Sequence, residues 1–403
     1  MKNPERLIQR PKYIERITPF MGKSIIKVLV GQRRVGKSYV LLQLMELIKT
    51  QNTTANIIYI NCEDMEFSDI KTAKQLHDYI LAKWDNATTN HIFIDEIQDI
   101  EEFENALRAL LLKDGNDIYI TGSHAKLLSG ELATYLSGRY VEFPIYSLSY
   151  PEFLDFHQLQ DLTVSFKLYE KFGGLPYLIH LQLTDEIAWE FLRNIYTTIL
   201  YRDVIMRYNI RSNVFFDKLV RFLADNIGSI FSSKKISDYL KSQQTNISSV
   251  QIQNFVNYLS NAFLIHRASR YDIVGKRIFE IGEKYYFENM GIRNSLIGYK
   301  ASDKAKILEN IVYNHLLYMN YNIKIGVVGN HEIDFICEKQ NERIYIQVSY
   351  DVENENTYER EFGNLLKIQD NYPKWVISND DFDGHSIEGI LVIPIRKFLL
   401  MDF

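Results

Sequence analysis

The segment Gly31-Gln-Arg-Arg-Val-Gly-Lys-Ser38 has the residue types and spacing of a phosphate-binding loop, G-x-x-x-x-G-K-[ST]. Glycines let the backbone curl so that N–H groups point at phosphate oxygens, and a following helix adds its positive dipole end. Lys37 would reach the β- and γ-phosphates, and the hydroxyl of Ser38 would ligate Mg²⁺. We therefore predict an ATP and Mg²⁺ site with nucleotide contacts from Gly31, Arg34, Val35, Gly36, Lys37, Ser38 and Tyr39.

Two carboxylates, Asp95 and Glu96, directly follow the apolar run His91–Ile94. A carboxylate at a strand end beside the phosphate loop could hold magnesium, so Asp95 joins Ser38 as a predicted metal ligand. Glu96 would orient or deprotonate the attacking water. The alternative is that the acidic pair merely begins a solvated loop. Its position after the strand, downstream of the phosphate loop, favours the catalytic interpretation.

A hydroxyl and a guanidinium complete the predicted catalytic set. In Thr121-Gly-Ser123 either hydroxyl could contact the γ-phosphate or the attacking water, although these residues are also common in turns. Arg139 is the candidate for neutralising the charge that develops in phosphoryl transfer. It could act within its own chain or on a neighbouring subunit of a homo-oligomer, or it could be a plain surface residue. We predict Glu96, Ser123 and Arg139 as catalytic residues.

The elements that must position these residues alternate between strand and helix. Four short β-branched runs suit strands buried on both faces of a parallel sheet, namely Ile25–Val30, Asn56–Ile60, His91–Ile94 and Ile118–Thr121. Between them, apolar residues recur at helical spacing in Ser38–Lys49, Asp69–Trp84 and Glu101–Lys113. This alternation predicts an α/β fold with the parallel sheet of a P-loop NTPase over residues 1–143.

Three further regions follow. Residues 144–211 indicate a helical lid or extension, with helices interrupted by proline and glycine. Residues 212–299 indicate three helices and two strands, the winged-helix pattern, at Phe215–Asn226, Ile236–Ser242, Ser248–Asn261, Leu264–Tyr271 and Arg277–Phe287. Residues 300–403 return to α/β, with helices at Ile307–Met319 and Tyr358–Tyr372 and strands at Asn322–Val328, Glu332–Glu338, Arg343–Val348, Lys374–Ile377 and Ile390–Val392.

The composition narrows the class of protein. A chain of 403 residues exceeds what one core usually organises, and 46% apolar with 24% charged residues is ordinary for globular domains. The net charge of −5 argues against a generally basic coat for nucleic acid, while leaving room for a local basic face. Two distant cysteines exclude a disulfide scaffold. Met1–Arg16 lacks the apolar core of a signal peptide, so we expect a cytoplasmic protein without membrane contact.

The order of several motifs resembles that of a known family. GQRRVGKS, IFIDEIQ, TGSHAKLLS, LSGRYVEFPIYSLSYPEF and FGGLPYLI are similar in sequence order to those of the AAA-type ATPases of bacteria and archaea. The likeness extends through EKYYFENMGIRN to ENIVYNHL and EIDFI near the end of the chain. The resemblance implies an ATPase core, a winged-helix middle and a C-terminal restriction-endonuclease-like domain.

The last region is similar to the PD-(D/E)xK nucleases but departs from their pattern. Glu309, Asp334 and Gln347 stand where such enzymes gather magnesium, yet Gln347 replaces an acid and Ser349 replaces the lysine. Lys367 could supply a cation from another position. We predict a degenerate nuclease site, with binding or assembly favoured over cleavage.

DNA is the candidate macromolecular partner. The predicted helix Ser248–Asn261 offers amides but no Lys or Arg, whereas phosphate contacts need cations. The predicted hairpin supplies cations at His266, Arg267, Arg270, Lys276 and Arg277, which could contact DNA or simply face solvent. The leading hypothesis is an ATP-hydrolysing switch or motor, possibly acting on DNA. The alternatives are a nucleotide-regulated assembly or defence sensor with slow turnover, and an ATP-gated, magnesium-dependent nuclease.

Overall fold

The chain divides into two compact units. The computed structural model describes residues 7–125, 136, 138–211, 213–273, 275, 282–350, 362–380 and 386–401. Unit 1 runs to Tyr146 and includes Asn261–Phe263, and unit 2 holds Ser147–Ser260 and Leu264–Phe403. The predicted boundary after residue 143 lies close to this division. The boundaries predicted after residues 211 and 299 both lie within unit 2.

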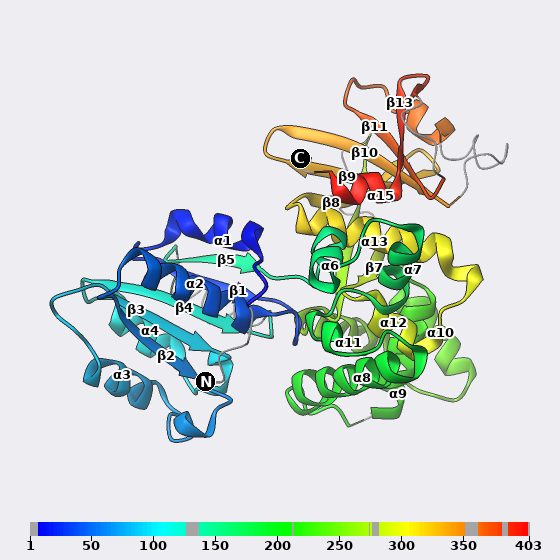
Figure 1. Cartoon of the computed structure of the whole chain (residues 1–403). Helices are drawn as coiled ribbons and strands as arrows, with labels where there is room; N and C mark the ends of the chain where they lie inside the picture. The colour runs from blue at the N-terminus through cyan, green and yellow to red at the C-terminus, as the bar shows by residue number, and fades with distance from the viewer. Residues whose placement is uncertain are drawn as a thin grey trace. The chain divides into compact units, whose positions relative to one another are not determined.

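Unit 1 contains a five-stranded sheet in the order β2-β3-β4-β1-β5, with every neighbouring pair parallel (Figure 1). The strands are β1 Ile26–Val30, β2 Asn56–Asn61, β3 Asn90–Asp95, β4 Asn116–Gly122 and β5 Tyr140–Pro144. The predicted α/β class and the parallel sheet of a P-loop NTPase are confirmed. Strand β5 was missed, because Glu142 and Pro144 interrupt its apolar run, as an edge strand allows.

The helices of unit 1 follow the predicted order. They are α1 Pro11–Ile17, α2 Lys37–Gln51, α3 Ala73–Ala82 and α4 Phe103–Leu111, with short 3₁₀ turns η1 Thr18–Phe20, η2 Met65–Phe67 and η3 Ile97–Asp99. Helix α3 starts later than the predicted Asp69, because Thr72 caps it. The Thr72 hydroxyl accepts a hydrogen bond from Gln75 N, and the Gln75 side chain accepts one from Thr72 N.

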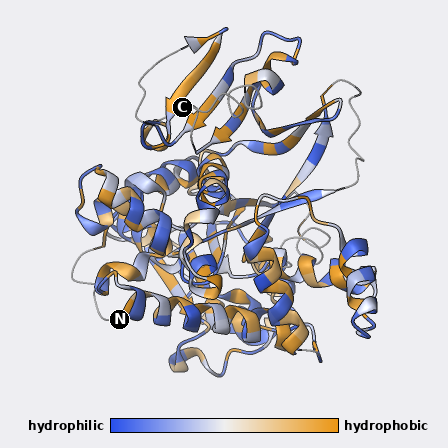
Figure 2. Ribbon diagram, turned by 90° about the vertical axis from the view of Figure 1, so that its right-hand side faces the viewer, coloured by the Kyte–Doolittle hydropathy of each residue, from blue (hydrophilic) through white to orange (hydrophobic). Residues whose placement is uncertain are grey.

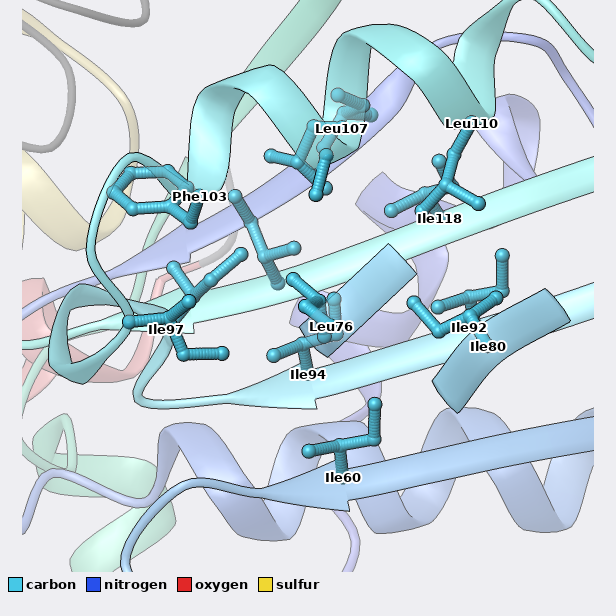
Figure 3. Close-up of a cluster of buried hydrophobic side chains, with 14 of the residues drawn as sticks. Ile60, Leu76, Ile80, Ile92, Ile94, Ile97, Phe103, Leu107, Leu110 and Ile118 are labelled. Carbon is cyan, nitrogen blue, oxygen red and sulfur yellow. The ribbon is translucent and has the colours of Figure 1, made fainter. Parts of the chain in front are cut away.

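One face of this sheet packs against α3 and α4. Ile92 and Ile94 of β3 point toward Leu107 of α4 and Leu76 of α3 in a cluster of buried side chains (Figure 3). All four side chains are fully buried. This packing explains the uninterrupted apolar runs, since strands of a parallel sheet are covered on both faces. By holding the strands in place, this packing also fixes the edge of the sheet at which their carboxyl ends lie.

Unit 2 begins with helices. They are α6 Tyr150–His157, α7 Thr163–Phe172, α8 Asp185–Thr198, α9 Asn213–Asp225, α10 Ser233–Ser242, α11 Ser249–Asn261, α12 Met290–Ile297, α13 Lys304–Tyr318 and α15 Ile395–Leu400, with the short helices η5 Pro176–His180, η6 Ile199–Met206 and η7 Ala301–Asp303. The predicted helical extension is confirmed.

Helix α12 was missed and packs closely on α7: a Cβ at Gly291 would lie 1.8 Å from the carbonyl oxygen of Phe172. The buried Arg293 of α12 pairs with Asp303 at 2.7 Å.

The strands of unit 2 form one mixed sheet in the order β12-β13-β11-β10-β9-β8-β6-β7. They are β6 Ile265–Asp272, β7 Glu283–Phe287, β8 Asn322–Val328, β9 His331–Lys339, β10 Glu342–Ser349, β11 Lys374–Ser378, β12 Ser386–Ile387 and β13 Ile390–Pro394. Strand β6 is shared, because Ile265–Ser269 pairs with β7 and Arg270–Asp272 pairs with β8. The helices and strands predicted for 212–299 occur in order, but their interpretation as a winged helix stays a prediction.

Hydrophobic and hydrophilic residues are mixed along the helices of both units (Figure 2). Among the described residues, none of the helices combines the length and apolar character that crossing a membrane requires. The predicted helix Tyr358–Tyr372 falls partly outside the described residues. Within them, residues 362–366 are helical and the chain turns at Lys367.

Candidate functional site

The predicted phosphate loop connects the end of β1 to the start of α2. A Cβ at Gly31 would lie 2.1 Å from the carbonyl oxygen of Ile145, so only glycine fits there. Gly36 has φ of 99° and precedes Lys37, the first residue of α2. Gly31 and Gly36 both have a positive φ, which glycine adopts without strain. The glycines therefore allow the sharp return from strand to helix, and they aim the N-terminus of α2 at the loop.

The ammonium group of Lys37 lies over this loop. Its Nζ donates hydrogen bonds to the carbonyl oxygens of Gly31 at 3.1 Å and Gln32 at 3.2 Å. It also lies 3.4 Å from Oε1 of Glu96. The side chain is buried, with 3% of its surface exposed. Two neutral carbonyls and one carboxylate thus hold the lysine.

Asp95 ends β3 at the same edge of the sheet. Its carboxylate is hydrogen-bonded by Ser38, the second residue of α2, and by Thr121, whose Oγ1 lies 2.5 Å from Oδ1. The Thr121 hydroxyl also accepts a hydrogen bond from Glu96 N at 2.8 Å. Burial raises the pKa of Asp95, and the bonds from Ser38 and Thr121 partly oppose that rise. Ser38 and Asp95, the two predicted magnesium ligands, are therefore in direct contact.

Glu96 is buried beside two cations. Burial alone would raise its pKa, but the charges of Lys37 and Arg33 outweigh burial and lower the pKa to about 2. Ser123 Oγ donates a hydrogen bond to Oε2 at 3.0 Å, and Gln98 donates to the same oxygen. Glu96 therefore stays ionised at neutral pH, as a group that orients or deprotonates water must be.

The geometry separates the two candidate hydroxyls. Thr121 is bonded to Asp95 and to the backbone of Glu96, so it fixes the acidic pair in place. Ser123 lies two residues further along, directly after β4, and is bonded to the carboxylate of Glu96. Ser123 is accordingly the hydroxyl that faces the group predicted to act on water.

Two arginines at this site were not predicted to act there. Nη1 of Arg33 lies 2.9 Å from Oε1 of Glu63, and Nη2 lies 3.5 Å from Oγ of Ser123. Arg10 Nη1 donates to the carbonyl oxygen of Val35 at 2.9 Å, which ties the N-terminal segment to the phosphate loop. The position of Arg33 inside the loop was a signal for its role. Arg10 has no signal in the sequence, because it lies far from the motif.

The remaining predicted residues differ in their placement. Val35 is fully buried, while Arg34 and Tyr39 are exposed at the loop and on α2, with 51% of the Tyr39 surface accessible. Arg139 does not join the site. Its carbonyl oxygen accepts a hydrogen bond from Ile26 N, at the start of β1, whereas the phosphate loop follows the end of β1.

Arg139 therefore lies away from the phosphate loop of its own chain, and its role in phosphoryl transfer stays a prediction. Arg139 precedes β5, which runs parallel to β1 and pairs Pro144 with Val30. At roughly 3.3 Å per residue, the five residues of β5 separate Arg139 from the carboxyl edge by about 16 Å, beyond the reach of an arginine side chain. The sequence could not reveal this, since it does not show the direction in which an unpredicted strand runs.

A second group of predicted residues meets in unit 2. Glu309 of α13 and Asp334 of β9 lie near Nζ of Lys284, a residue of β7 that was not predicted, and Gln347 of β10 contacts Asp334. Gln347 Oε1 accepts a hydrogen bond from Asp334 N at 3.0 Å. Lys367, the suggested substitute cation, lies instead 2.7 Å from Nε2 of His331. Within the described residues, no group of three or more acidic, histidine or cysteine side chains has a metal-binding arrangement.

The described part of the hairpin holds some of the cations predicted to contact DNA. Two of its predicted cations already lie near carboxylates, His266 at 2.6 Å from Glu288 and Arg267 at 3.5 Å from Glu283. Lys276 and Arg277 lie outside the described residues. DNA as a partner of this hairpin stays a prediction.

Known proteins are similar to the chain over its whole length. An AAA domain model matches residues 23–154, and a domain of unknown function (DUF8612) matches residues 164–303. An uncharacterised Haemophilus influenzae protein is 37% identical over 98% of this chain and 99% of its own length. An uncharacterised Methanocaldococcus jannaschii protein is 32% identical over 93% of this chain and 88% of its own length.

A solved structure of the Aeropyrum pernix ORC1 protein in complex with DNA has a TM-score of 0.33 and 11% identity, covering 73% of this chain and 94% of that one. A likeness at this level carries no functional argument. The AAA domain match covers the phosphate loop and the acidic pair, the residues that meet at the carboxyl edge of the unit 1 sheet. The chain belongs to the same family as these Haemophilus influenzae and Methanocaldococcus jannaschii proteins, and its residues 23–154 match an AAA domain.

Proposed function

We propose that unit 1 binds ATP with magnesium and hydrolyses it to ADP and phosphate. The observation that carries this proposal is the meeting of Lys37, Ser38, Asp95, Glu96 and Ser123 at one edge of a parallel sheet. A phosphate loop, a helix N-terminus, a cation and an acidic pair together form the set of groups that holds a magnesium-bound triphosphate. The AAA domain match over the same residues supports it.

The side chains of this site have distinct roles in the proposal. Lys37 exchanges its hydrogen bonds to Gly31 and Gln32 for bonds to phosphate oxygens, since a charge-assisted bond is stronger than one to a neutral carbonyl. Glu96, held as a carboxylate, orients or deprotonates the attacking water. Magnesium bound by Ser38 and Asp95 would neutralise the negative charge of the phosphates.

The nucleotide state would then act as a switch for the rest of the chain. A motor requires steady turnover, whereas a nucleotide-regulated assembly or sensor requires tight retention and slow turnover. Arg139 is exposed, so in a homo-oligomer it remains a candidate for acting on nucleotide bound to a neighbouring subunit. Measuring ATP hydrolysis against protein concentration, with and without DNA, distinguishes these forms of the proposal.

Two substitutions test the proposed site directly. Lys37→Ala should weaken MgATP binding at least about 100-fold, as measured by calorimetry. The reason is that it removes two or more charge-assisted hydrogen bonds, each contributing about 1.5 kcal/mol or more. Glu96→Gln should keep MgATP binding within a few-fold and lower the hydrolysis rate by about 100-fold, since general base catalysis supplies about 10²–10⁴.

Lys49→Ala is the matched control, because Lys49 is an exposed lysine on the same helix α2. It should leave both binding and hydrolysis at the level of the original protein. Unchanged affinity in Lys37→Ala would remove the phosphate loop from the proposal. An unchanged rate in Glu96→Gln would remove Glu96 from catalysis.

A further inference from the structure

Lys284 lies among three carboxylates in unit 2. Its Nζ is 2.7 Å from Oε1 of Glu332, 3.1 Å from Oε1 of Glu309 and 3.9 Å from Oδ1 of Asp334. Only 3% of the lysine side chain is exposed, and it is the cation in direct contact with all three acids among the described residues. Glu332 and Asp334 are two residues apart on β9, so both side chains point to the same face of the sheet.

The oxygens of these acids are also bonded to the protein. Tyr286 donates its hydroxyl to Oε1 of Glu309 at 2.7 Å, and Val348 N donates to Oδ2 of Asp334 at 2.9 Å. The amide oxygen of Gln347, which could otherwise offer a neutral ligand to a metal, accepts from Asp334 N. These donors stabilise the negative charge that a single ammonium group does not neutralise.

The space around the cluster is filled as well. Gly228 follows α9 with φ of 68°, and a Cβ at this glycine would lie 2.9 Å from both carboxylate oxygens of Glu309. The backbone therefore packs directly onto the acid on one side, while Lys284 contacts it on another.

We propose that Lys284 takes the place of a divalent metal ion in this cluster. Its ammonium group pairs with Glu309, Glu332 and Asp334 from within the chain, so this site binds no divalent ion and cleaves no phosphodiester. The site is thereby converted into an internal contact that joins β7 to α13 and β9. This inference is independent of the ATPase proposed for unit 1, because it concerns different residues and a different ligand.

Titration of the full chain with Mn²⁺ in the absence of nucleotide, followed by electron paramagnetic resonance, tests the inference. The original protein should show no Mn²⁺ site that Asp334→Asn removes. Lys284→Met should gain one site, at least tenfold tighter than any background binding, because it leaves three carboxylates without their cation. Adding Asp334→Asn to Lys284→Met should abolish the new site, and Lys284→Arg should not create one.

Three results would overturn the inference. The first is a Mn²⁺ site in the original protein that Asp334→Asn abolishes, and the second is a folded Lys284→Met protein that gains no site. If Lys284→Met does not fold, the double variant Lys284→Met with Glu332→Gln leaves two carboxylates and decides the question by the same gain or lack of gain. Cleavage of plasmid DNA with Mn²⁺ that disappears in Asp334→Asn would equally refute it.

Discussion

The two units each bury a lysine beside carboxylates, but the partners of the two lysines differ. Lys37 in unit 1 donates to two backbone carbonyls and lies 3.4 Å from a single carboxylate. Lys284 in unit 2 lies within 3.1 Å of two carboxylates and 3.9 Å from a third. An arriving phosphate can compete with neutral carbonyls for an ammonium group far better than with carboxylates.

The comparison shows that a buried lysine among carboxylates does not by itself indicate a ligand-binding site. What matters is whether the lysine would lose strong partners when a ligand binds. In unit 1 the acid Glu96 keeps Ser123, Gln98 and Arg33 nearby if Lys37 turns toward phosphate. In unit 2 Lys284 contacts three carboxylates at once, so it would lose three charged partners if it turned toward a ligand.

The largest effect should appear when the two lysines are replaced in the same way. Lys284→Met should lower the free energy of unfolding of unit 2 by about 3 kcal/mol, since it leaves the buried Asp334 and the partly buried Glu309 and Glu332 without this cation. Lys37→Met should cost less, because Glu96 loses one of two nearby cations but keeps Arg33 and the hydrogen bonds from Ser123 and Gln98. Urea unfolding followed by circular dichroism measures both. Equal losses would break the comparison.

Buried acids extend the comparison to pH. Glu170 of α7 in unit 2 has its pKa raised to about 7 by burial, which Lys304 and Tyr299 only partly offset, whereas the pKa of Glu96 is lowered to about 2. The pKa of Glu170 is higher in the folded protein than in the unfolded chain, where it is near 4.5. Glu170 therefore contributes stability to the folded state below pH 4.5, and this contribution is lost as the pH rises toward 7.

Glu170→Gln should therefore gain stability relative to the original protein as pH rises from about 4.5 to 8, by about 3 kcal/mol for a shift of this size. Urea unfolding of both proteins across that range checks it. The contribution of Glu96 to the stability of the folded state depends on pH in the opposite direction. It is present above pH 4.5 and is lost as the pH falls toward 2. A constant difference between Glu170→Gln and the original protein would show that Glu170 is not buried as described.

The smallest effect concerns Arg33, which sharpens the account of unit 1. Arg33→Ala removes the guanidinium beside Ser123 and one of the two cations that keep Glu96 ionised. ATP hydrolysis should fall about tenfold, the equivalent of about 1.4 kcal/mol of transition-state stabilisation, with MgATP binding nearly unchanged. The acidic limb of the pH–rate profile should move to higher pH. Lys49→Ala again serves as the control, and a reduced rate without a shifted limb would limit Arg33 to a structural role.

Local features of unit 1 could be predicted from the sequence. The spacing of Gly31, Gly36, Lys37 and Ser38 determines a loop that only certain residues can form, and the β-branched runs determine the buried strands. The meeting of Ser38 with Asp95 also followed, because the carboxyl ends of parallel strands share one edge. Helix α12 and strand β5 were missed, since neither has a strong periodic or apolar pattern of its own.

The sequence by itself thus determined the phosphate loop, the acidic strand end and the alternation that builds the parallel sheet, because these depend on neighbouring residues and short periods. Only the tertiary structure decided that Ser123 faces Glu96, that Arg139 lies at the opposite edge, and that Lys284 enters the acidic cluster of unit 2. Those contacts join residues distant along the chain. They depend on strand order and direction, which the spacing of residues does not encode.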